Sequence, residues 1–283
     1  MTNEPIAGLR GRQLAARLRE VVDESGISGI DAAAVLGLAQ STISRLLTGR
    51  REPNAVKVAM LLGLCRVPAV DHADILDLLG PDDPGGWWVR PHGDGSPEEV
   101  SSVRFGYATA ATIECWSPGG LPALVQTSEF IDADLPGHGL DEQGRARWVR
   151  ARREHQALLF RRDGPTLVAY LDERVLSSLP VPEEVRQGQF IRLAMLIGQG
   201  RLHVRIVPAD RDSARLGAGF SLLRFAGFVP VVCVPGETVT LLLEHDRHRA
   251  AYERQLATLN RIALSTEDSK RIILALADER PRP

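Results

Sequence analysis

The stretch SGIDAAAVLGLAQSTISRLLTGRREP, residues 28–53, decides how the first part of this chain folds. Its aliphatic residues recur at helical spacing in two short runs, which Gly37 separates. Glycine readily takes the left-handed backbone angles that end a helix sharply. Ala33 is small enough to let two helices cross closely, and Ile43 and Leu46 face back into the angle between them. The pattern predicts a helix-turn-helix.

The predicted second helix, residues 40–48, presents an outer face of short or forked hydrogen-bonding side chains. Such groups reach base edges in the major groove, where glutamine pairs with adenine and arginine pairs with guanine. The residues predicted to read bases are Gln40, Ser41, Ser44 and Arg45. The residues predicted to contact phosphate are Arg50, Arg51 and Lys57, because phosphate binding needs a local positive charge. An ordinary helical hairpin with a solvated polar face is the alternative interpretation.

The segment AQSTISRLLTGRREPN resembles the recognition helix and basic loop of the XRE family of bacterial regulators, which have a lambda-repressor-like helix-turn-helix. An amphipathic run at residues 9–25 predicts a helix before it. Two more helices are expected after it, capped by Asn54 and Asp71. The resemblance covers about the first 80 residues, and it implies a five-helix DNA-binding domain.

Residues 81–97 are dense in proline, glycine and aspartate, which predicts a linker between a first domain at 1–80 and a second at 98–283. Trp87 and Trp88 interrupt this linker. Two adjacent large aromatic side chains are expected to dock on a neighbouring domain.

The second domain is predicted to mix helices and strands. Ser96 and Glu99 form a capping box that predicts a helix through about residue 116. An arginine-rich helix is expected at 141–162, and TLVAYL, LHVRIVP, FSLLRF, VPVVCV and TVTLLLE are expected strands. The last four strands follow one another, which favours an antiparallel meander. The predicted fold class is therefore multidomain, with an all-α five-helix domain followed by an α+β domain containing an antiparallel sheet.

The segments LPALVQTSEF, RWVRARREHQALLF and ALSTEDSKRII resemble an effector-like domain of unknown function. That domain follows the XRE helix-turn-helix in many actinobacterial, antitoxin-like regulators. The resemblance implies a transcriptional regulator, and such proteins are often encoded beside a very small protein that acts as a partner. The chain departs from the family at residues 121–123, which read Leu-Pro-Ala where Pro-Gly-Leu is usual.

Composition limits the class of protein. The chain has 283 residues, a hydrophobic content of 44% and a net charge of −2, so any nucleic-acid binding must come from a local patch. Cys65, Cys115 and Cys233 lie far apart, which predicts neither a metal site nor a disulfide framework. The sequence also lacks a signal core and an apolar run long enough for a membrane span. We therefore expect a cytoplasmic protein that needs no cofactor.

Few residues suggest further chemistry. The cluster Glu244-His245-Asp246 with His248 is the most site-like, but its place at a strand-to-helix junction favours a helix cap at Asp246. No catalytic motif is present, which predicts a protein that is not an enzyme. The second domain's aromatic residues form either its core or a small-molecule pocket. The candidates for lining that pocket are Tyr107, Trp116, Phe130, Trp148 and Tyr170.

These patterns predict a sequence-specific regulator that binds double-stranded DNA as a homodimer, with half-sites about one DNA turn apart. Its second domain would bind a small neighbour-encoded protein or a small-molecule ligand. One alternative is an antitoxin-like scaffold that sequesters a small partner, with DNA binding secondary. Another is an enzyme with a DNA-binding head, which would need a catalytic constellation.

Overall fold

A computed structural model describes residues 8–49, 54–79, 87–92, 95–134, 139–210 and 216–278 of the chain. The chain divides into two compact units, one made of residues 1–84 with 227–229 and the other of residues 85–226 with 230–283. We call them the first unit and the second unit and describe each by itself.

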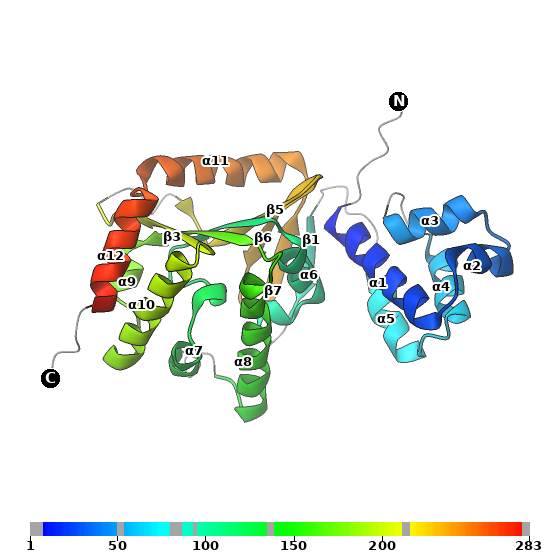
Figure 1. Cartoon of the computed structure of the whole chain (residues 1–283), viewed down its shortest axis with the longest axis horizontal. Helices are drawn as coiled ribbons and strands as arrows, with labels where there is room; N and C mark the ends of the chain where they lie inside the picture. The colour runs from blue at the N-terminus through cyan, green and yellow to red at the C-terminus, as the bar shows by residue number, and fades with distance from the viewer. Residues whose placement is uncertain are drawn as a thin grey trace. The chain divides into compact units, whose positions relative to one another are not determined.

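The first unit contains the five predicted helices (Figure 1). They are α1 (Leu9–Ser25), α2 (Gly29–Leu36), α3 (Gln40–Thr48), α4 (Ala55–Leu64) and α5 (Ala69–Asp77). Asn54 caps α4 as expected, because its side chain accepts a hydrogen bond from the Lys57 backbone at 3.2 Å. The predicted cap at Asp71 is wrong. Helix α5 begins earlier, directly after Pro68, and Asp71 lies in its first turn.

The turn between α2 and α3 has the geometry expected of a helix-ending glycine. Gly37 lies at φ 64° and ψ 29°. Its N–H donates to the Ala34 carbonyl at 3.3 Å, and the Leu38 N–H donates to the Ala33 carbonyl at 2.9 Å. These two bonds satisfy carbonyls that the end of α2 would otherwise leave unpaired. Ala33 and Ile43 are buried in the core of the unit, so the two helices cross as predicted.

A second glycine brings α3 against α1. Gly49 ends α3 at φ 66°, and a Cβ atom placed there would lie 3.0 Å from the Gly11 carbonyl oxygen of α1. A side chain at position 49 would therefore be strained in its backbone and crowded by a neighbouring helix.

The second unit is built on a seven-stranded mixed sheet with the order β1-β7-β6-β5-β2-β3-β4. The strands are β1 (Trp87–Pro91), β2 (Thr112–Ser117), β3 (Thr166–Asp172), β4 (Leu202–Val207), β5 (Phe220–Phe225), β6 (Phe228–Pro235) and β7 (Val239–Leu243). Strands β2, β3 and β4 are parallel neighbours, whereas β5 pairs with β2 and β7 pairs with β1 and β6 in antiparallel fashion. The fold class is as predicted, but the sheet is not antiparallel throughout.

The predicted four-strand meander is wrong for its first member. Strand β4 pairs with β3 in parallel, and the consecutive neighbours are β5, β6 and β7. The connections explain the difference, since parallel neighbours need a crossover of a dozen or more residues. Helices α9 (Glu173–Ser177) and α10 (Glu183–Gly198) form such a crossover between β3 and β4.

Two segments fold differently from their predictions. The helix that follows Ser96 and Glu99 consists of the short 3-10 turn η1 (Pro97–Glu99) and α6 (Ser101–Thr109), and residues 112–117 form strand β2 instead. Its β-branched and aromatic residues suit a strand held between β3 and β5. Residues 87–91, inside the predicted linker, form edge strand β1. There the Trp88 indole N–H donates to the Glu244 carboxylate at 3.2 Å.

Helices cover both faces of this sheet, with α11 along one face and α7, α8 and α10 on the other (Figure 1). Helix α11 (Asp246–Ile262) contributes Leu256 and Leu259 to a core that also contains Trp116 and Phe220. The remaining elements are η2 (Ala123–Val125), α7 (Ser128–Asp134), α8 (Glu142–Ala157), η4 (Leu158–Phe160) and α12 (Thr266–Asp278).

Candidate functional site

The outer face of α3 carries the residues predicted to read bases. Ile43 and Leu46 fill the core and Leu47 packs against it, so the polar side chains at positions 40, 41, 44 and 45 lie on the other side of this short helix. Gln40, Ser41 and Ser44 are exposed, and Arg45 is half-buried. The start of α3 has no side-chain cap, which leaves its first backbone N–H groups available to a phosphate oxygen. The structure therefore brings these four residues together on one hydrogen-bonding surface.

The Arg45 side chain is held on that surface by Ser41, one helical turn earlier. Its Nε donates to the Ser41 carbonyl oxygen at 2.9 Å, and its Nη2 donates to the Ser41 hydroxyl at 3.1 Å. The guanidinium therefore lies along the helix, toward the end that a recognition helix presents to bases.

Of the three residues predicted to contact phosphate, the structure describes Lys57. Lys57 is half-buried in the first turn of α4. Arg50 and Arg51, the other two candidates, lie outside the described residues.

A cavity of about 440 Å³ lies in the second unit, where β2, α6, α8 and the loop at residues 117–124 meet. Tyr107 and Trp116, two of the predicted pocket residues, line it. The structure does not place Phe130, Trp148 and Tyr170 in its lining. Trp148 packs with Ile131 in a separate cluster, and the Tyr170 hydroxyl donates to the Asn260 side-chain oxygen at 2.7 Å.

Sequence reasoning missed three charged or polar residues of this cavity, which are Glu98, Arg152 and His155. Arg152 and His155 lie in α8 among exposed arginines, so they look like part of a solvated face. Their spacing of four and seven residues from the buried Trp148 is the signal that could have found them, because these positions share one face of a helix.

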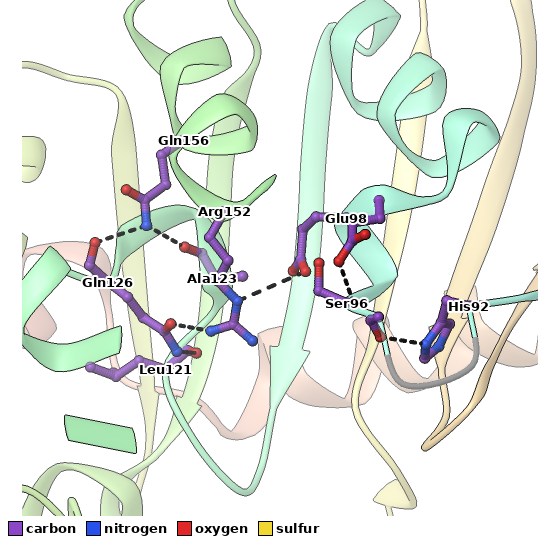
Figure 2. Close-up of polar contacts among 10 residues, drawn as sticks. His92, Ser96, Glu98, Leu121, Ala123, Gln126, Arg152 and Gln156 are labelled. Carbon is purple, nitrogen blue, oxygen red and sulfur yellow. Dashed lines mark hydrogen bonds and ion pairs between the residues drawn. The ribbon is translucent and has the colours of Figure 1, made fainter. Parts of the chain in front are cut away.

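Glutamines hold the wall of the cavity in place (Figure 2). Gln126 donates to the Leu121 carbonyl at 2.9 Å, and Gln156 donates to the Ala123 and Gln126 carbonyls at 2.8 Å each. Arg152 in turn donates to the Gln126 side-chain oxygen. These bonds give the Leu121 and Ala123 carbonyls of the loop a partner within the protein.

Burial keeps one histidine and two cysteines of the cavity uncharged. It lowers the pKa of His155 to about 4, against a raising effect of Glu98, so the imidazole is neutral at pH 7. Burial also raises the pKa of Cys115 and of Cys233 to about 12, so both remain thiols rather than thiolate nucleophiles. The Tyr107 hydroxyl is hydrogen-bonded to Ser221 at 2.8 Å.

The other cluster that the sequence singled out has structural contacts. His245 rather than Asp246 caps α11, and its ring accepts a hydrogen bond from the Arg247 backbone at 3.2 Å. Asp246 forms an ion pair with Arg249 at 2.6 Å. Within the described ranges, no group of three or more histidine, cysteine or acidic residues could hold a metal ion. The helices in those ranges also include none that is long and apolar enough to span a bilayer.

Comparison with known proteins bears on both units. The family model described as Domain of unknown function (DUF5753) matches residues 107–275. A model described as Helix-turn-helix domain matches residues 13–75. No curated protein matches the chain. A solved structure of TrmBL2, described as an archaeal chromatin protein with a novel mode of DNA binding, is similar at 10% identity and a TM-score of 0.28. That alignment covers 84% of this chain and 88% of TrmBL2, and a TM-score this low supports no inference about fold or function.

Proposed function

Because the chain belongs to the DUF5753 family and carries a helix-turn-helix domain ahead of the family's domain, we propose that it is a sequence-specific DNA-binding transcriptional regulator. The observation that carries the proposal is the outer face of α3, which presents hydrogen-bonding side chains while its inner face is packed in the core. Helix α3 would lie in the major groove. A regulator of this kind acts on DNA in the cytoplasm.

Each candidate residue has a role in this proposal. Gln40, Ser41, Ser44 and Arg45 read base edges. Arg50, Arg51 and Lys57 contact phosphates, which gives affinity without sequence preference. The proposal assigns no catalytic step to any of these residues.

We also propose that two copies bind together, each reading one half-site. Helix-turn-helix proteins commonly work as dimers whose recognition helices lie about one DNA turn apart. The second unit forms the dimer and binds a small protein partner or ligand that changes the affinity for DNA. By thermodynamic linkage, DNA then changes the affinity for that partner or ligand by the same factor.

Fluorescence anisotropy of the full chain on the DNA upstream of its own gene, against a scrambled duplex, tests the proposal. Specific binding should be at least about a thousandfold tighter than binding to the scrambled duplex. Both affinities should fall as salt rises, because bound phosphates release counterions. Replacing Arg261, an exposed arginine of α11 in the second unit, by alanine is the control and should change neither affinity. Equal affinity for the two duplexes would contradict sequence-specific recognition.

A second candidate function is an antitoxin-like scaffold that binds a small partner, with DNA binding secondary. The exposed arginines of α8, at positions 145, 147, 150 and 153, favour it, because they give this helix an excess of positive charge that an acidic partner could bind. Co-purification of the small neighbour-encoded protein at a fixed stoichiometry would support this function. It should persist in an Arg45→Ala variant, and failure to co-purify would count against the scaffold.

A further inference from the structure

The cavity of the second unit is far larger than a packing defect. Protein interiors contain few voids bigger than one water molecule. A volume of about 440 Å³ would hold roughly 15 waters, at about 30 Å³ for each water. It falls within the range of about 300–1,000 Å³ that is typical of small-molecule sites.

The lining of the cavity is mainly apolar. Apolar side chains form most of it, among them Val103, Ile113, Leu121, Leu124 and Leu167. Water gains little hydrogen bonding against such a surface, so an apolar molecule is a better occupant than a cluster of waters.

Two charged groups of the lining are left without a full set of partners. Glu98 is 7% exposed, and within the described part of the chain its Oε2 atom has no hydrogen-bond donor. Its ion-pair partner is Arg152, whose Nε lies 3.8 Å from Glu98 Oε2 (Figure 2). That distance is too long for a hydrogen bond, although both atoms are buried. Buried polar groups are nearly always paired, so these two atoms require a further partner.

The hydroxyl group of a ligand could form hydrogen bonds with both Glu98 Oε2 and Arg152 Nε. An oxygen about 2.8 Å from both atoms would donate its hydrogen to the carboxylate and accept the Arg152 N–H. A carboxylate ligand would instead be repelled by Glu98, and an ammonium ligand would be repelled by Arg152.

We infer that this cavity binds an uncharged, largely apolar small molecule that carries a hydroxyl group, with the hydroxyl bridging Glu98 and Arg152. The inference deepens the proposed function, because it names the ligand class and its site in the second unit. An effect of the ligand on DNA binding rests on the proposed function. Binding of the ligand to the cavity does not depend on that function.

Equilibrium dialysis of the full chain with 2-naphthol and naphthalene, a pair that differs by one hydroxyl, tests the inference. We expect 2-naphthol to bind one molecule per chain, at least about tenfold more tightly than naphthalene. The charged analogue 2-naphthoate should bind more weakly than 2-naphthol. Absence of saturable 2-naphthol binding, equal affinity for 2-naphthol and naphthalene, or tighter binding of 2-naphthoate would each overturn the inference.

A double variant tests the assigned residues. Glu98→Met with Arg152→Met replaces the buried ion pair by apolar side chains, a change that folded proteins often tolerate. It should bind the two uncharged probes with equal affinity, within about twofold. The control is Arg104→Met with Glu154→Met, which removes an exposed ion pair at 3.1 Å between α6 and α8 and should keep the preference. A preference that survives in the first variant would overturn the assignment.

The experiments test the DNA-binding regulator and the ligand site independently. Probe binding is measured without DNA, and DNA binding is measured without probe. Binding of 2-naphthol as expected, together with equal affinity for upstream and scrambled DNA, would leave the ligand site standing and remove the regulator. Specific binding to upstream DNA without saturable binding of 2-naphthol would leave the regulator standing and remove the ligand site.

Discussion

Arg45 is already fixed on the outer face of α3, since Ser41 accepts two hydrogen bonds from its guanidinium. A side chain held in place loses less conformational freedom when it binds a base. Replacing Arg45 by alanine should therefore cost about 1–3 kcal/mol at the preferred DNA site and relax the preference at one base position. Anisotropy titrations on a set of single-base site variants would measure both effects.

Lys57→Ala is the companion variant, because we assign this residue to phosphate. It should weaken binding to every sequence alike and lower the salt slope by about one. An Arg45→Ala protein with unchanged affinity and unchanged base preference would refute the assignment of base readout.

His155 makes the stability of the second unit depend on pH. Burial lowers the pKa of this residue from 6.5 to about 4, so the unfolded chain takes up a proton first as the pH falls. The stability that neutral His155 contributes is therefore complete above pH 6.5 and is lost progressively toward pH 4. The loss in the free energy of unfolding is about 3 kcal/mol over this window.

Urea unfolding at pH 7.5, 6 and 5 would measure this loss. All four tryptophans lie in the second unit, so their fluorescence reports on that unit. The stability of wild-type protein should fall more steeply with decreasing pH than that of a His155→Gln variant. Parallel profiles for the two proteins would contradict the assignment.

At the scale of elements, Gly49 sets how closely α3 approaches α1. Its positive φ and the nearby Gly11 carbonyl leave no room for a side chain. Gly49→Ala should therefore destabilise the first unit by about 1–2 kcal/mol. Gly63→Ala, within α4 where a Cβ atom meets nothing within 4 Å, is the control and should be neutral or stabilising. Thermal unfolding followed by circular dichroism compares the two variants, and equal effects would count against this role for Gly49.

The edge strand β1 covers β7, and we expect it to protect β7 from pairing with other chains. Residues 87–91 pair with residues 239–243, and an edge strand stripped of its neighbour is a template for aggregation. A fragment of residues 98–283 should therefore aggregate, whereas a fragment of residues 85–283 should stay dispersed. Light scattering at equal concentration distinguishes them, and identical behaviour would show that β1 has no protective role.

The sequence predicted elements well where the information is local. The helices of the first unit follow from apolar spacing and from Gly37, and the outer face of α3 follows from the same periodicity. Strand β1 was missed because its partner β7 lies about 150 residues away, and nothing in a run of proline, glycine and tryptophan signals that pairing. The Glu98–Arg152 pair was missed for the same reason, since its members become neighbours only when α8 packs against η1.

At the scale of the whole molecule, the proposed dimer would require a fixed spacing between two half-sites on the DNA. If two α3 helices read half-sites one DNA turn apart, inserting five base pairs between the half-sites rotates one of them by about half a turn. Specific binding should then fall toward the non-specific level, and inserting ten base pairs should restore part of it. Anisotropy on the three duplexes measures the effect, and binding that tolerates the five-base-pair insertion would exclude a rigid dimer.

The position of β1 also limits where a gene fusion could separate the two units of this protein. If a gene fusion joined another DNA-binding domain to the second unit, its junction would have to lie before Trp87, since a later junction would remove the edge strand. A crossover beyond Glu98 would in addition delete one half of the ion pair in the cavity. In related proteins whose first unit has been exchanged, the fusion junction should therefore lie upstream of Trp87. Residues 87–98 should then be kept together with the sheet that follows.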